Sequence, residues 1–173
     1  MKFEDINFNE IYKEQKEKSS FKTKSKEAWD KKAISMNQRV HNSIYNEQFL
    51  KQINLDGIES LLDVGCGVGN LSLIFAKKLK EVYSLDYSSK MLEILEENAK
   101  KEKLSNIKTI NKSWYEKWDD VPNADLVIAS RSMEVKDMKE ALLKLNEKAN
   151  KKVVVTYKVG GSFVSSEILK VIG

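Results

Sequence analysis

The stretch from Leu61 to Asn70, Leu-Leu-Asp-Val-Gly-Cys-Gly-Val-Gly-Asn, constrains the fold more than any other part of this chain. Two leucines predict the end of a buried strand, three glycines follow at alternate positions, and the apolar residues after Asn70 are spaced as in an amphipathic helix. Glycines let the backbone approach a ligand closely, and the free N–H groups of the first helical turn face it. The sequence therefore predicts a ligand-binding turn at the end of a strand.

The spacing of the glycines narrows the choice of ligand. The dinucleotide fingerprint is Gly-x-Gly-x-x-Gly, whereas here Gly69 comes one residue early after Gly65 and Gly67. No Lys-Ser/Thr pair follows, which excludes the phosphate-binding P-loop. Asp86 ends the next apolar run about 20 residues after Gly65, where a carboxylate that binds a ribose is expected. Together these residues predict a nucleoside site without a pyrophosphate.

Two segments of the sequence resemble the motifs of one enzyme family. Residues Asp63 to Asn70 resemble the glycine-rich motif of class I S-adenosylmethionine-dependent methyltransferases, and Asp86-Tyr-Ser-Ser-Lys-Met-Leu resembles their second motif, in which an acid holds both ribose hydroxyls. The resemblance extends from about Trp29 to about Tyr157, and it implies S-adenosyl-L-methionine as cofactor and S-adenosyl-L-homocysteine as product. The cofactor-binding residues that it implies are Asp63, Gly65, Cys66, Gly67, Gly69, Asp86, Tyr87, Met91, Ser113, Trp114 and Ser130.

The third motif of the family departs from its usual pattern in this chain. The family has an acid that binds the adenine amino group after the third strand, and Ser113 stands in its place. The resemblance then leaves the Ser113 hydroxyl and the Trp114 ring to contact the adenine. Cys66 lies where the family often has Cys or Ala, and a nucleophilic role would need a histidine partner that no motif around His41 supplies.

Apolar runs and amphipathic stretches alternate through most of the chain. Strands are predicted at 60–64, 81–86, 106–111, 124–130 and 152–157, and helices at 70–79, 88–102, 135–149 and 162–172. Strands separated by helices indicate an α/β fold with a doubly wound, mainly parallel sheet of the Rossmann-like type. The sheet of the family ends in an antiparallel strand hairpin, for which the residues after Tyr157 leave no room. The resemblance therefore implies an open sheet edge, at which the chain can form a homodimer.

The chain of 173 residues, 41% of them hydrophobic, is long enough for a buried core. We divide it into an N-terminal helical lid or arm at 1–54 and an S-adenosylmethionine-binding core at 55–173. The lysine-rich start of the arm has three interpretations: a solvated, partly disordered arm, a helical lid held by its aromatic residues, or a basic arm for RNA. Residues 36–53 have helical spacing and predict a helix that packs on the sheet.

Four residues are candidates for the substrate site, namely Trp29, His41, Tyr45 and Arg131. Trp29 lies in an Ala-Trp-Asp segment that resembles the element closing over the cofactor in many small-molecule methyltransferases. His41 and Tyr45 are four residues apart and share a helical face. Arg131 follows a predicted strand and suits an anionic substrate or the carboxylate of the cofactor, although a surface ion pair with Glu134 would explain it equally well.

The sequence assigns no catalytic residue. The methyl group of a sulfonium is already activated, so alignment and the exclusion of water can supply much of the rate. Glu134, His41 and Tyr45 are the candidates for a base, which only an acidic nucleophile needs. The loop after the fourth strand lacks the Asn/Asp-Pro-Pro-Tyr/Phe signature of enzymes that methylate the amino groups of adenine or glutamine, which argues against those substrates.

The composition argues against a membrane-spanning, a secreted or a metal-binding protein. No apolar run approaches the about 20 residues of a membrane-spanning helix, no signal peptide is evident, and a single cysteine is consistent with the cytoplasm. No cluster of histidine and cysteine indicates a metal site. The net charge of +4 is compatible with nucleic-acid binding without requiring it.

These observations favour an S-adenosylmethionine-dependent methyltransferase that acts on a small-molecule acceptor by in-line displacement. Two alternatives stay open, because the fold alone does not decide function. One is an RNA or protein methyltransferase that uses the lysine-rich arm, for which salt-dependent RNA binding would be diagnostic. The other is a nucleotide-binding Rossmann protein that transfers no methyl group.

Overall fold

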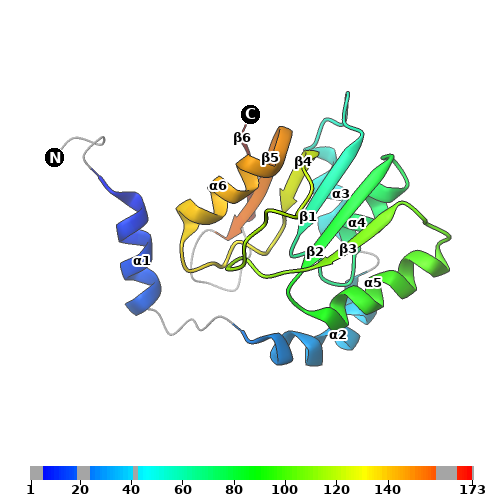
Figure 1. Ribbon diagram of the computed structural model, residues 1–173, viewed down its shortest axis with the longest axis horizontal. Coiled ribbons are helices and arrows are strands. Elements are labelled where there is room, and N and C mark those ends of the chain that lie inside the picture. The colour runs from blue at the N-terminus through cyan, green and yellow to red at the C-terminus, as the bar shows by residue number, and fades with distance from the viewer. Residues whose placement is uncertain (1–5, 19–23, 41–42, 159–166, 173) are drawn as a thin grey trace.

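The computed structural model describes residues 6–18, 24–40, 43–158 and 167–172, with the side chains of 39–40, 158 and 167–172 excepted. Six strands form one sheet in the order β3-β2-β1-β4-β5-β6 (Figure 1). The strands are β1 (Ser60–Val64), β2 (Glu81–Asp86), β3 (Ile107–Asn111), β4 (Ala124–Ala129), β5 (Ala149–Lys158) and β6 (Glu167–Ile172). The first five run parallel to their neighbours, as predicted, and β6 runs antiparallel to β5.

Helices cover both faces of this sheet. Three of them, α3 (Ile44–Lys51), α4 (Asn70–Ala76) and α5 (Ser89–Lys101), pack on one face, and α6 (Met138–Lys148) packs on the other. Alternate residues of a strand contribute to the two cores. Leu62 lies in the core between the sheet and α6, and Leu61 lies in the core on the other face, with α4. This two-sided burial explains why the central strands β1 and β4 are mostly apolar, and it confirms the predicted doubly wound fold.

The N-terminal part of the chain is helical where the structure describes it. Helix α1 (Phe8–Lys18) contains no buried residue, whereas α2 (Lys26–Val40) packs along α5 (Figure 1). The single helix predicted at 36–53 is wrong, because α2 ends at Val40 and α3 begins at Ile44. The side chain of Ser43 accepts a hydrogen bond from the backbone N–H of Tyr45, which starts the new helix.

The helix predicted at 162–172 is also wrong in the part that the structure describes. Residues 167–172 form β6, which pairs with β5 from Lys158–Glu167 to Val153–Ile172. Ile, Leu, Val and Ile in this short segment favour a strand once a neighbouring strand is available for pairing. The open edge expected along β5 is therefore occupied. The domain boundary at residue 54 stays a prediction.

Candidate functional site

The glycine turn lies at the carboxyl ends of β1 and β2, where parallel sheets bind ligands. The backbone N–H groups of Gly65 and Cys66 both donate hydrogen bonds to the carbonyl of Leu85, with N···O distances of 2.7 and 3.1 Å. The next turn residue, Gly67, donates its N–H to Oδ2 of Asp86 at 2.9 Å. The turn is thus joined to the end of β2 at three successive donors.

The three glycines serve different purposes. A Cβ on Gly65 would lie 2.4 Å from Cβ of Ser132, and one on Gly69 would lie 2.7 Å from the side chain of Leu95. Next to Gly67 the closest atom is Cε of Met36, at 3.8 Å. All three glycines have a positive φ. Gly65 and Gly69 are therefore required by packing as well as by backbone conformation, whereas Gly67 leaves room for a ligand beside the backbone.

Asp86 presents a carboxylate at the end of β2. Its Oδ1 accepts the N–H of Ser88 at 2.8 Å, and its Oδ2 accepts the N–H of Gly67. Burial raises the pKa of this carboxyl, and the backbone N–H donors partly offset that effect. A carboxylate has about four acceptor positions, so the two that these bonds leave suit the two adjacent hydroxyls of a ribose.

Asn70, the first residue of α4, carries an unsatisfied acceptor at the same turn. Its Oδ1 is buried and has no hydrogen-bond partner among the described residues. A buried acceptor without a partner is costly and indicates a missing donor. A ligand with an N–H or O–H group at the glycine turn would supply that donor, so the turn fits a nucleoside ligand with an ammonium or hydroxyl group. Asn70 is not among the residues predicted to bind the cofactor, although it directly follows the third glycine.

Asp63 lies beneath the turn and faces the protein interior. Its Oδ2 accepts the hydroxyl of Ser72 at 2.7 Å, and Ser84 in turn donates to Ser72 at 2.8 Å. Burial raises the pKa of Asp63 to about 7, with a smaller contribution from the charge of Asp86. Only 2% of Asp63 is exposed. In this arrangement it supports the turn from below.

Helix α2 closes one side of the site. Oδ1 of Asp30 accepts the hydroxyl of Ser88 at 2.5 Å and the N–H of Lys90 at 3.3 Å, so α2 helps to cap α5. Trp29 packs against the buried cluster that contains Met91, as do other residues of α2. Met91 is fully enclosed there. The sequence resemblance implies contact with the cofactor for Met91 and makes Trp29 a candidate for the substrate site, and in the structure both belong to this one apolar cluster.

Ser113 and Trp114 lie in a compact turn after β3. The indole N–H of Trp118 donates to the carbonyl of Ser113 at 2.9 Å, and the rings of Trp114 and Trp118 lie 5.4 Å apart. The ammonium of Lys144 donates to the carbonyl of Trp114 at 2.7 Å. Trp114 thus packs on the core beneath α6, which restricts its freedom to stack on an adenine.

A polar cluster lies at the carboxyl ends of β4 and β5. The hydroxyl of Tyr45 lies 2.5 Å from Oγ of Ser130 and 3.4 Å from that of Thr156, which also accepts the N–H of Arg131 at 2.8 Å. The guanidinium of Arg131 lies 3.7 Å from the centre of the Tyr45 ring. Arg131 has a φ of 58°, a strained conformation for a residue with a side chain. The next residue, Ser132, contacts Gly65, so this cluster adjoins the glycine turn.

The remaining candidates occupy varied positions. Tyr87 is 44% exposed, whereas Cys66 is buried, and burial raises the pKa of its thiol well above the usual value, which opposes thiolate formation. His41 lies outside the described residues. Glu134 is exposed.

No group of acids, histidines or cysteines in the described ranges is arranged to hold a metal ion, and none of the described helices is long and apolar enough to cross a bilayer.

Residues 55–169 match the family model described as a methyltransferase domain. The chain belongs to this family. The match contains the whole glycine turn and Asp86, the residues that carry the resemblance to class I S-adenosylmethionine-dependent methyltransferases. Family membership confirms the sequence-based identification.

Several individual proteins are similar to this chain in sequence or in structure. A protein from Haemophilus influenzae is 38% identical over 171 residues, which cover 98% of this chain and 64% of that protein, so the chain spans less than two thirds of this relative. Shorter matches are the 23S rRNA (uracil(1939)-C(5))-methyltransferase RlmD of Aliivibrio fischeri, 36% identical over 43% of this chain and 17% of that protein, and the demethylmenaquinone methyltransferase of a Geobacillus species, 33% identical over 39% and 30%. A SAM-dependent methyltransferase from Aquifex aeolicus has the same fold, with a TM-score of 0.62, 18% identity, and coverage of 82% of this chain and 77% of that one.

Replacing Gly65 by alanine should destabilise the protein more than the same change at Gly57. Both glycines have a positive φ, which costs an alanine about 1–2 kcal/mol. Only at Gly65 does the new methyl group collide with Ser132, which adds about 1–3 kcal/mol, whereas nothing lies within 4 Å at Gly57. Urea unfolding of both variants measures the difference. Equal losses would contradict the close contact.

Asp63→Asn should change how stability depends on pH. Because the pKa of Asp63 is about 7 in the folded state against an ordinary value of 3.8, the unfolded chain holds fewer protons between these values. The wild-type free energy of unfolding therefore decreases as the pH rises from about 4 to about 7 through this group. The variant lacks this decrease, so its stability relative to wild type should rise by roughly 2–4 kcal/mol over that range.

Urea unfolding at several pH values between 4 and 8 provides the measurement. Asp125→Asn is the control, because hydrogen bonds lower the pKa of Asp125 and leave its titration below this range. Stability curves for Asp63→Asn and wild type that run parallel from pH 4 to 7 would show that Asp63 titrates normally.

Proposed function

We propose that this chain binds S-adenosyl-L-methionine at the glycine turn and transfers its methyl group to a small-molecule acceptor, leaving S-adenosyl-L-homocysteine. The observation that carries the proposal is the pairing of Asp86 with the Gly67 N–H at the carboxyl ends of β1 and β2. It places a carboxylate with two remaining acceptor positions beside Gly67, the one turn glycine at which an added Cβ would meet no clash. The unpartnered Oδ1 of Asn70 adds an acceptor for the ammonium of the amino acid portion.

The bound sulfonium supplies an activated methyl group. With the cofactor bound, a lone pair on the acceptor atom would form the new bond to the methyl carbon as the carbon–sulfur bond broke. The bonding pair would stay on sulfur, and any proton on the acceptor atom would pass to a base or to water. The chain contributes alignment and a site that excludes water. Helix α2, fixed to α5 through Asp30 and Ser88, is placed to provide that exclusion.

The cluster of Tyr45, Ser130 and Arg131 is the proposed contact for polar groups next to the glycine turn. Its hydroxyls and guanidinium suit a carboxylate, either on the acceptor or on the cofactor. The stacked position of Arg131 over Tyr45 supports this role, because stacking fixes the plane of the guanidinium. We assign no base, and the cytoplasmic location stays a prediction.

An RNA or protein acceptor is the second candidate. Two observations favour it: the lysine-rich sequence of the first 32 residues, and the similarity to an rRNA methyltransferase over 43% of the chain. Several of these lysines have partners within the chain, since Lys13 pairs with Asp137 and Lys24 and Lys32 lie over the ring of Trp29. RNA binding that weakens steeply with salt would favour this candidate. Membership of the methyltransferase family argues against the third interpretation, a Rossmann protein without this activity.

Asp86→Ala should weaken the binding of S-adenosyl-L-methionine about 100-fold or more. The variant removes two hydrogen bonds to a charged acceptor, each worth about 1.5–3 kcal/mol. Isothermal titration calorimetry of the purified chain measures the loss. Asp125→Ala is the matched control. Asp125 lies at the start of the central strand β4, at the amino ends of the parallel strands and thus at the end of the sheet opposite the glycine turn, so affinity should stay unchanged.

A parallel titration with NAD tests the choice of cofactor. We expect the titration with NAD to give no saturable heat of binding, because the glycine spacing provides no pyrophosphate site. Binding of NAD in place of S-adenosyl-L-methionine, or equal affinities of wild type and Asp86→Ala, would refute the assignment of the site.

A further inference from the structure

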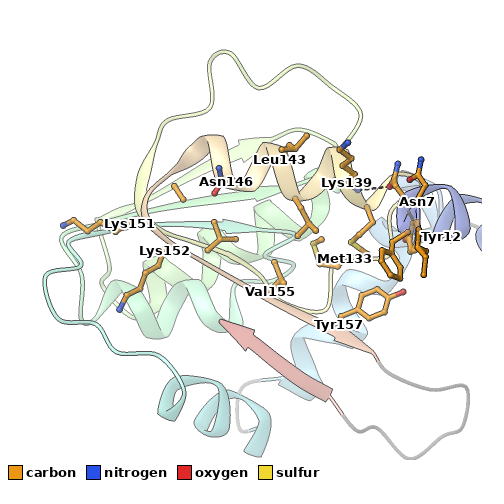
Figure 2. A pocket seen from close by; sticks show the side chains of 17 residues that line it. Asn7, Tyr12, Met133, Lys139, Leu143, Asn146, Lys151, Lys152, Val155 and Tyr157 are labelled. Atoms are coloured by element: carbon orange, nitrogen blue, oxygen red, sulfur yellow. Dashed lines mark hydrogen bonds between the residues drawn. The ribbon is translucent and has the colours of Figure 1, made fainter. Parts of the chain in front are cut away.

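A large groove lies beside α6 (Figure 2). Its volume is about 1020 Å³, at the upper end of the range of about 300–1,000 Å³ for small-molecule sites. Side chains of α1, α6 and β5 form its walls and floor. The apolar ones are mainly Phe8, Met138, Leu142, Leu143, Val153 and Val155.

The groove gathers apolar side chains that remain in contact with water. Phe8 is 53% exposed, Leu143 58% and Tyr157 42%, and all three line this one cavity. Single exposed apolar residues are common, but a concave group of them indicates a binding site. The described lining contains lysines and no acidic residue, so it suits a neutral or anionic ligand better than a cationic one.

Helix α1 forms one wall, and specific polar contacts hold it there. The hydroxyl of Tyr12 donates to the carbonyl of Val135 at 2.6 Å, and Lys13 pairs with Asp137 at 2.5 Å. The side chain of Asn9 accepts the N–H of Lys139 at 3.2 Å. Since α1 buries no residue, apolar packing does not explain its position. These contacts keep the groove open between α1 and α6.

One end of the groove adjoins the candidate cofactor site. Tyr157 lies near the carboxyl end of β5, the same end of the sheet at which the glycine turn lies. Met133 lines the groove and directly follows Ser132, which contacts Gly65. Figure 2 shows Tyr12, Met133 and Tyr157 together at this end, with Asn146 and Lys151 toward the other.

We infer that this groove binds the apolar body of an elongated small molecule, with its polar head at the end formed by Tyr12, Met133 and Tyr157. Naming that molecule as the methyl acceptor rests on the proposed function. The head then carries the atom that takes the methyl group in the displacement described above, and the body lies along Val155 and Val153 beneath α6.

The neutral fluorophore N-phenyl-1-naphthylamine tests the groove directly. Titration of the full chain should give a saturable rise in fluorescence. Leu143→Glu should weaken binding about tenfold or more, because it places a charge against an apolar ligand at an exposed position that tolerates the change. Ile34→Glu is the matched control, since Ile34 is 62% exposed on α2 and lies outside the groove, and it should leave binding unchanged.

Calorimetry with S-adenosyl-L-methionine on the same proteins separates the two claims. We expect both variants to bind S-adenosyl-L-methionine like wild type. We also expect S-adenosyl-L-methionine not to displace the fluorophore from the groove. Displacement, equal weakening in Ile34→Glu, or no saturable fluorescence would overturn the groove as a ligand site. A wild type that binds the fluorophore and not S-adenosyl-L-methionine would keep the groove and overturn its interpretation as an acceptor site. Sedimentation velocity adds one outcome: a dimer that Leu143→Glu converts to monomer would make the groove an interface between copies and overturn the inference.

Discussion

The candidate cofactor site depends on the hydrogen bonds that join the glycine turn to the end of β2. Leu85 accepts two backbone N–H groups from the turn, and Asp86 accepts a third from Gly67. The buried carboxylate needs these donors to offset its desolvation, and the turn needs an acceptor because its N–H groups lie outside any helix. Each group therefore fixes the other. Helix α2 is added to this arrangement through Ser88, two residues further along the chain.

The sheet could be predicted from the sequence because its signals are local. Most of the strands β1 to β5 contain a run of apolar residues, and helices with a clear period follow β1, β2 and β4. The residue types of the glycine turn indicate its backbone conformation. The failures occurred where pairing or capping decided the structure. β6 is a strand because β5 lies beside it, and the break before α3 follows from the cap at Ser43, which a spacing count from residue 36 to 53 passed over.

The site was predicted unevenly for a similar reason. Motif residues such as Gly67 and Asp86 lie where the sequence indicated. The contact between Gly65 and Ser132, and the bond from Ser88 to Asp30, join residues that are far apart in the chain. Asn70 could not be predicted, because its importance lies in a buried acceptor without a partner, which depends on the packing around it. The groove beside α6 has no sequence motif, since three separate elements create it.

Helix α1 illustrates how uneven stability is across this molecule. Tyr12 and Val135 are 123 residues apart in the sequence, and α1 buries no side chain. Opening of α1 therefore breaks a few polar contacts without disturbing the sheet, so its free energy is far below that of global unfolding. We therefore expect the amide protons of α1 to exchange with solvent faster than those of β1 and β4. Helix α1, which forms a wall of the groove, is thus an element that a ligand can order at small cost. The affinity for that ligand then includes the free energy needed to hold α1 in its place beside α6.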